Sequence, residues 1–155
     1  MVKEKKLLIS SSAFKHNERI PDKFTCEGED VSPPLEIKEI PKTAKSLVLI
    51  VDDPDASGRT WDHWLVWNIS TKGIIEEGKV PGIQGVNSAG MRDWHGPCPP
   101  RGTHRYFFKV FALDTMLNLV NFTGKVKVEE AMKGHILAKG TLIGKYEMPK
   151  EKKQN

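Results

Sequence analysis

The sequence predicts a mostly β fold with one or two short helices. Ser46–Asp52 (SLVLIVD) is short, continuously apolar and rich in β-branched residues, which is typical of a buried strand. His63–Ser70 combines two Trp with branched aliphatic residues, and His104–Leu113 is heavily aromatic. Only one segment of the chain has convincing helical spacing, so strands are expected to dominate.

The remaining elements have weaker patterns. Four further segments predict strands: Leu7–Ser11, Leu35–Ile40, Gly73–Glu77 and Thr141–Met148. Apolar residues recur at intervals of three and four from Val128 to Leu137, and Gly140 follows, so we predict a helix over 128–137. Thr115–Val120 would add one helical turn.

The 155 residues are expected to form a single domain, with frayed basic tails at 1–6 and 149–155. The formal net charge is +4, but residues 3–6 and 150–153 each contribute +2. Residues 7–149 therefore hold 18 basic and 18 acidic groups. A neutral body argues against an extended groove for nucleic acid.

Apolar runs, the N-terminal sequence and the cysteines bear on the cellular compartment of the protein and on whether it contains a disulfide. No apolar run is long enough to span a bilayer, and the N-terminus has no signal-peptide core, so we expect a cytoplasmic protein without a transmembrane segment. The two cysteines, Cys26 and Cys98, are too few for a disulfide framework. A single bridge between them stays open at this point.

Three loops of unusual composition carry the candidate functional residues: 26–34, 52–60 and 87–103. The second loop holds an acidic cluster, and histidines begin two predicted strands, at His63 and His104. A strand would point His104 and Tyr106 to the same face. These residues could gather with the Gly-Pro-Cys-Pro-Pro backbone in one pocket.

Such a pocket allows three chemical interpretations. Ring N–H, phenol O–H and loop N–H groups are donors suited to a small oxyanion or phosphorylated ligand. A metal site would use His63, His95 and His104 with Cys98 or Asp53, although no tight metal-ligand spacing is present. Nucleophilic catalysis would use Cys98 or a serine as the nucleophile. However, the prolines on both sides of Cys98 suit a rigid turn, and the sequence contains no catalytic serine motif.

Plainer structural roles compete with these interpretations. Taken alone, Asp52 and Asp53 are better explained as caps of a turn, a common role of Asp. The chain contains neither a phosphate-binding P-loop nor a dinucleotide-binding glycine pattern. We therefore expect no cofactor and no enzyme activity.

Four further motifs lie in register along the chain: Phe24–Pro34 (FTCEGEDVSPP), Asp53–Ala56 (DPDA), Trp61–Trp64 (WDHW) and Gly96–Tyr106 (GPCPPRGTHRY). Together they resemble the phosphatidylethanolamine-binding proteins, also called Raf kinase inhibitor-like proteins, in their compact bacterial and archaeal branch. The resemblance implies a large central antiparallel sheet packed on a smaller one, with short helices at the edge.

The resemblance also implies a small pocket for phosphate, phosphoryl head groups or carboxylates. Its residues would be Asp53, Asp55, Trp61, His63, Gly96, Cys98, Pro100, His104 and Tyr106. The family pattern continues with a second proline where this chain has Ser57, so the Ala56–Ser57 bond is expected to be trans, or the turn to differ.

The function implied by the resemblance is that of a regulatory or inhibitory binding module. The alternative is an inhibitor of a serine peptidase or kinase that acts by protein–protein contact. A homodimer is a further expectation from compact relatives.

Overall fold

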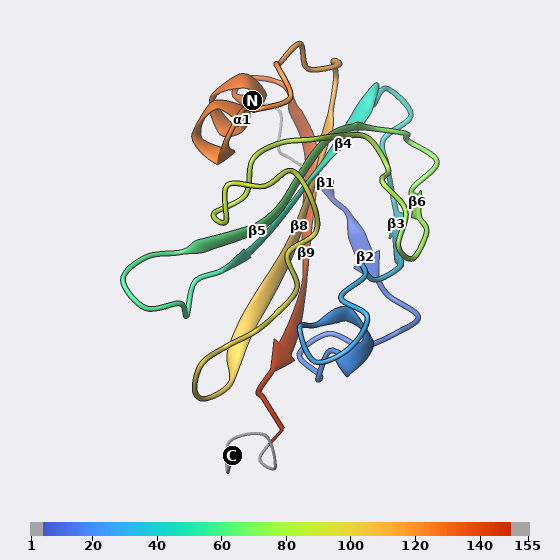
Figure 1. The fold of residues 1–155 in the computed structure, drawn as a ribbon. Coiled ribbons are helices and arrows are strands. Elements are labelled where there is room, and N and C mark those ends of the chain that lie inside the picture. The colour runs from blue at the N-terminus through green and yellow to red at the C-terminus, as the bar shows by residue number, and fades with distance from the viewer. Residues whose placement is uncertain (1–4, 150–155) are drawn as a thin grey trace.

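The fold, in a computed structural model that describes residues 5–149, consists of two sheets, one α-helix and one 3₁₀ turn (Figure 1). In chain order the elements are β1 (Lys5–Lys6), β2 (Leu8–Ser10), η1 (Asp22–Phe24), β3 (Leu35–Lys38), β4 (Ser46–Asp53), β5 (Trp61–Ile69), β6 (Ile74–Ile75), β7 (Ile83–Gln84), β8 (His104–Leu113), α1 (Lys125–Met132) and β9 (Ile136–Tyr146). The large sheet has the order β1-β9-β8-β4-β5-β7, and the small sheet has the order β2-β3-β6. The mostly β fold with two sheets is confirmed.

Strand β4 lies inside the large sheet and is buried along its whole length. Leu47, Leu49 and Val51 pack into the core shared with the small sheet. Val48 and Ile50 point to the other face, where they join a second cluster with α1. Because both faces of the strand are covered, its sequence is continuously apolar and does not alternate.

The strand pairing brings three chain segments together at one end of the strands of the large sheet. β4 pairs antiparallel with both β5 and β8, so the end of β4 lies beside the starts of its two neighbours. Asp53 lies opposite Trp61, and Asp52 lies opposite Phe107. Loops that are far apart in sequence therefore meet at this end.

The helix prediction over 128–137 is wrong at both ends. α1 begins at Lys125 and ends at Met132, and the chain then turns at Gly134, whose positive φ of 81° suits glycine. From Ile136 onward the backbone pairs with β8 as part of β9, whose predicted start was Thr141. Thr115–Val120 forms no helical turn. Pairing with a ten-residue strand outweighs the local helical spacing.

The expectation of frayed ends needs one correction. Lys5 and Lys6 form β1, which runs parallel to β9 opposite Ala138 and Lys139. Of the other expected tail residues, Pro149 is described and has no regular secondary structure, and residues 1–4 and 150–155 lie outside the described residues. α1 is much too short to cross a membrane, and no helix in the described residues could do so. The cytoplasmic location stays a prediction.

Candidate functional site

A pocket of about 220 Å³ opens where the end of β4 meets the starts of β5 and β8. It is lined by Asp53, Ala56, Ser57, Trp61, His63, His95, Gly96, Cys98, Pro99, Pro100, His104 and Tyr106. Eight of the nine residues predicted from the sequence are among them, and Asp55 is the exception. The predicted residues thus come together in space, although they span about fifty positions of the chain.

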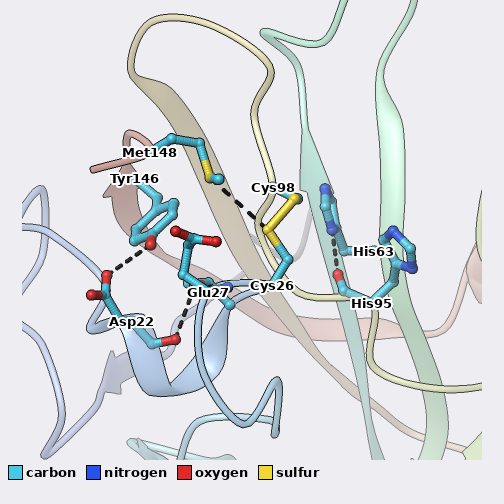
Figure 2. Close-up of a disulfide and its surroundings, with 9 residues drawn as sticks. Asp22, Cys26, Glu27, His63, His95, Cys98, Tyr146 and Met148 are labelled. Carbon is cyan, nitrogen blue, oxygen red and sulfur yellow. Dashed lines mark hydrogen bonds between the residues drawn. A yellow bond between two sulfur atoms is a disulfide. The ribbon is translucent and has the colours of Figure 1, made fainter. Parts of the chain in front are cut away.

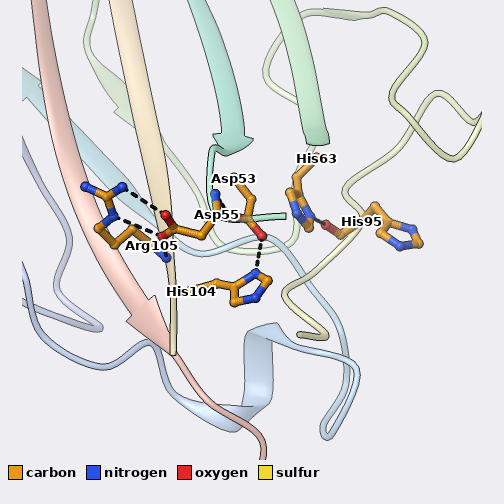
Figure 3. Close-up of polar contacts among 6 residues, drawn as sticks. All are labelled: Asp53, Asp55, His63, His95, His104 and Arg105. Carbon is orange, nitrogen blue, oxygen red and sulfur yellow. Dashed lines mark hydrogen bonds and ion pairs between the residues drawn. The ribbon is translucent and has the colours of Figure 1, made fainter. Parts of the chain in front are cut away.

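Among residues 5–149, Asp53 is the only carboxylate in the pocket lining, and both of its oxygens have protein partners. Its Oδ2 accepts a hydrogen bond from His104 Nδ1 at 2.7 Å (Figure 3). Its Oδ1 accepts the backbone N–H of Asp55 at 2.8 Å, which is the turn-capping role that the sequence also allowed. The side chain is only 4% exposed. Asp53 therefore both caps the turn and holds His104 in the pocket lining.

His63 is buried on β5 and faces the loop that closes the pocket. Its Nδ1 bonds the carbonyl oxygen of His95, and the backbone N–H of His95 donates in return to the carbonyl of His63 at 3.1 Å (Figure 3). Burial lowers the pKa of His63, although the bond to His95 opposes that shift. The ring is therefore neutral at pH 7, with Nδ1 as the donor and Nε2 left as an acceptor.

Tyr106 lies on β8 in ring contact with both histidines. Its ring meets that of His63 edge-on, with centroids 5.2 Å apart, and stacks on that of His104 at 6.5 Å. Burial, assisted by the negative charge of Asp53, raises the pKa of Tyr106. Its hydroxyl group therefore keeps its proton and can donate a hydrogen bond to a ligand.

Asp55, whose role as a ligand-binding residue stays a prediction, lies outside the pocket lining and contacts Arg105. Its two oxygens accept from Arg105 Nη2, Nε and the Arg105 backbone N–H, each at 2.9 Å (Figure 3). These bonds hold the pKa of Asp55 below its usual range. Asp55 thus ties the β4–β5 loop to the start of β8, behind the pocket lining.

The open question about the cysteines is resolved by a disulfide between Cys26 and Cys98 (Figure 2). Their Cα atoms are 5.5 Å apart although 72 positions separate them in sequence. The bond excludes Cys98 as a thiolate nucleophile in this state. It also connects one wall of the pocket to the loop that follows η1.

Four lining residues were absent from the predicted set. Ala56 and Ser57 belong to the turn where this chain departs from the family pattern, and the bond between them is trans, as expected. His95 entered only the metal alternative, and Pro99 lies inside a motif whose neighbours were chosen. Across residues 5–149 no group of three or more His, Cys, Asp or Glu side chains could hold a metal ion.

Comparison with known proteins identifies the family of the chain. A family model described as phosphatidylethanolamine-binding protein matches residues 10–147. A UPF0098 protein from Methanothermobacter thermautotrophicus is 46% identical over 146 residues, covering 89% of this chain and 97% of that protein. One from Pyrococcus horikoshii is 48% identical, covering 93% of this chain and 78% of that protein.

Two crystal structures share the fold. A protein from Chlamydia trachomatis, described as a homologue of phosphatidylethanolamine-binding protein, is 41% identical with a TM-score of 0.90, covering 94% of this chain and all of that one. YbcL from E. coli, described as a member of the mammalian family, is 29% identical with a TM-score of 0.84, covering 93% of this chain and 99% of that one. The chain therefore belongs to the phosphatidylethanolamine-binding protein family.

Proposed function

We propose that this protein binds a small oxyanion, such as phosphate, a phosphoryl head group or a carboxylate, in the pocket at the end of β4. One observation carries the proposal: the pocket gathers His63, His104 and Tyr106 around a single carboxylate that is already engaged. Because Asp53 directs its lone pairs at His104 and a loop N–H, the charge of the acid is partly neutralised within the protein. The remaining ring and hydroxyl groups are free to serve a ligand.

The hydrogen-bonding pattern predicts which form of the ligand fits best. Tyr106 supplies a donor, while His63 and His104 each use Nδ1 within the protein and keep Nε2 for a ligand. A bare Nε2 accepts a hydrogen bond, so His63 favours an oxyanion that carries a proton, and a fully ionised one requires a protonated ring. Phosphate monoesters lose their second proton near pH 6, so both protonation states are accessible near neutrality.

Titration calorimetry with inorganic phosphate tests the proposal. His104→Asn is expected to weaken binding about tenfold, because the bond to Asp53 no longer positions a ring nitrogen. His135→Asn is the matched control, since His135 Nδ1 forms a similar 2.8 Å contact to Asp114 far from the pocket lining. Equal affinity of the two variants would contradict the proposed site.

The pH dependence of sulfate binding is a second test. Sulfate carries no proton near neutrality, so it can contact His63 only when that ring is protonated. Because burial lowers the pKa of His63, sulfate affinity should rise as the pH falls below 7. A sulfate affinity that is constant between pH 5 and 8 would show that His63 does not contact the anion.

The finer expectations about partners still rest on the resemblance. Inhibition of a serine peptidase or kinase remains the alternative function, and a homodimer remains the expected assembly. Incubation with a chymotrypsin-like peptidase tests the first expectation, and light scattering tests the second. Full peptidase activity at equimolar protein would count against the inhibitor alternative.

A further inference from the structure

We propose that the Cys26–Cys98 disulfide is a redox control on the pocket, and that its reduction weakens oxyanion binding. This inference rests on the proposed function, since it assigns a regulation to the same site. It concerns the rim, which we define as residues 93–103, the segment that crosses the pocket and leads into β8.

The disulfide joins the pocket to a separate part of the chain. Cys98 is itself a lining residue, whereas Cys26 lies outside the lining on the loop after η1 (Figure 2). Both cysteines are exposed to solvent. A dithiol reductant can therefore approach the bond without unfolding the protein, which a buried structural disulfide would prevent.

The inner half of the rim, residues 93–97, is held by several hydrogen bonds. The His95 backbone N–H donates to the carbonyl of His63, and the indole N–H of Trp94 donates to the carbonyl of Phe24 at 3.1 Å. The backbone N–H of Cys26 donates to the carbonyl of Pro97 at 3.2 Å. None of these contacts uses a sulfur atom of the disulfide, so we expect the inner half to stay in place when the S–S bond opens.

The outer half of the rim, residues 98–103, lacks comparable anchors. Its backbone forms no backbone hydrogen bond outside regular strands with any other residue between 5 and 149. Within it, only Pro99 is buried. The disulfide is therefore the main link between its first residue and the rest of the fold.

The consequence for the pocket follows from preorganisation. Cys98, Pro99 and Pro100 contribute to the lining, so the bond holds a wall of the binding site in one conformation. When a loop must be ordered upon binding, the ordering entropy is subtracted from the affinity. Opening the bond therefore weakens binding while the strand-borne residues Asp53, His63 and Tyr106 keep their places.

The redox step needs a dithiol reductant, of the kind supplied by a small dithiol protein or by dithiothreitol. One thiolate of the reductant attacks a sulfur of the bond and forms a mixed disulfide. Its second thiolate then displaces the remaining cysteine. Cys26 and Cys98 each end as a thiol, and the reductant ends as a disulfide, so two electrons and two protons are transferred.

Calorimetric titration of the full chain with inorganic phosphate, before and after reduction, tests the binding effect. We expect about threefold to tenfold weaker binding after reduction. The double variant Cys26→Ser, Cys98→Ser should bind as the reduced protein does and should not respond to dithiothreitol. Equal phosphate affinity in the oxidised and reduced proteins would overturn the proposal, as would a disulfide that resists excess dithiothreitol in the folded protein.

Backbone ¹⁵N relaxation of the ligand-free protein separates this inference from the proposed function. Reduction should increase the mobility of the amides of residues 98 and 101–103 and leave residues 94–96 unchanged. Unchanged relaxation at 98–103, or loss of the whole β structure by circular dichroism at 25 °C, would overturn the redox control. Failure of the oxidised protein to bind phosphate would contradict the proposed function instead.

Discussion

Two consecutive acids at the end of β4, Asp52 and Asp53, are both buried but have different partners. Asp52 binds Lys109 Nζ at 2.9 Å and Lys125 Nζ at 3.4 Å, on the side of the sheet away from the pocket lining. Asp53 lies in the pocket and binds His104. Successive residues of a strand point to opposite faces, so one dipeptide serves two environments.

The difference in partners indicates different roles: Asp52 belongs to a structural ion pair, whereas Asp53 holds a histidine that can bind a ligand. Lys109 and Lys125 both bind Asp52, and Lys125 also binds Asp62 at 2.7 Å. The charged groups of this network therefore pair with one another. The histidine that binds Asp53 has a second ring nitrogen left over. We infer that the Asp52 side stabilises the fold, whereas the Asp53 side forms the proposed anion site.

Replacing Asp52 should have the largest effect on stability. Asp52→Ala leaves two lysines without their shared partner at a site where the acid is 2% exposed, and we expect a loss of about 2–3 kcal/mol in the free energy of unfolding. Urea unfolding measures that loss. Phosphate affinity should change less than twofold, and a large loss of affinity would break the division between the two sides.

Replacing Asp53 should act chiefly on binding. Asp53→Asn keeps an oxygen that can cap the Asp55 N–H but removes the charge that holds His104. We expect about a tenfold loss of phosphate affinity, close to 1.4 kcal/mol, with a stability loss of about 1 kcal/mol. If phosphate bound more tightly to this variant, Asp53 would act only by repelling the anion.

His63, on the pocket side of the sheet, should make the free energy of unfolding depend on pH. Its pKa is lowered in the folded protein, so below about pH 6.5 the unfolded chain binds the proton first, and folding stability falls as the pH drops. Each unit of pKa difference corresponds to about 1.4 kcal/mol. Urea unfolding of wild type and His63→Gln between pH 5 and 8 should show a shallower slope in the variant. Identical slopes would mean that His63 is not responsible.

The smallest effect is expected for Asp55, outside the pocket lining. Asp55→Asn weakens the contact with Arg105, which is exposed, so phosphate affinity should fall by less than twofold. A tenfold loss in the same calorimetric titration would return Asp55 to the binding site that the sequence predicted.

The sequence predicts the strands best where composition and pairing agree. His104–Leu113 is strongly aromatic and is observed as β8 with the same bounds. The segment from 128 to 137 misleads because Ile136 fits a helical face and a strand equally well. Its strand state depends on pairing with Leu113, a partner that local spacing cannot reveal.

The candidate site shows the same limit. His104 and Tyr106 could be identified because strand alternation places them on one face. His63 could be identified because it begins a predicted strand, and all three residues lie in the segments that resemble the family. The side-chain direction of Asp55 depends on Arg105, and the disulfide depends on the distance between two loops, so neither could be derived from residue types. Both are tertiary contacts across at least fifty positions of the chain.

Nitrogen-15 NMR of the histidine rings during a phosphate titration tests the central claim most directly, because it observes the groups that would touch the anion. We expect saturable shifts of the Nε2 resonances of His63 and His104, with no shift at His135. Shifts of equal size at all three rings, or none at millimolar phosphate, would contradict an oxyanion site at the end of β4.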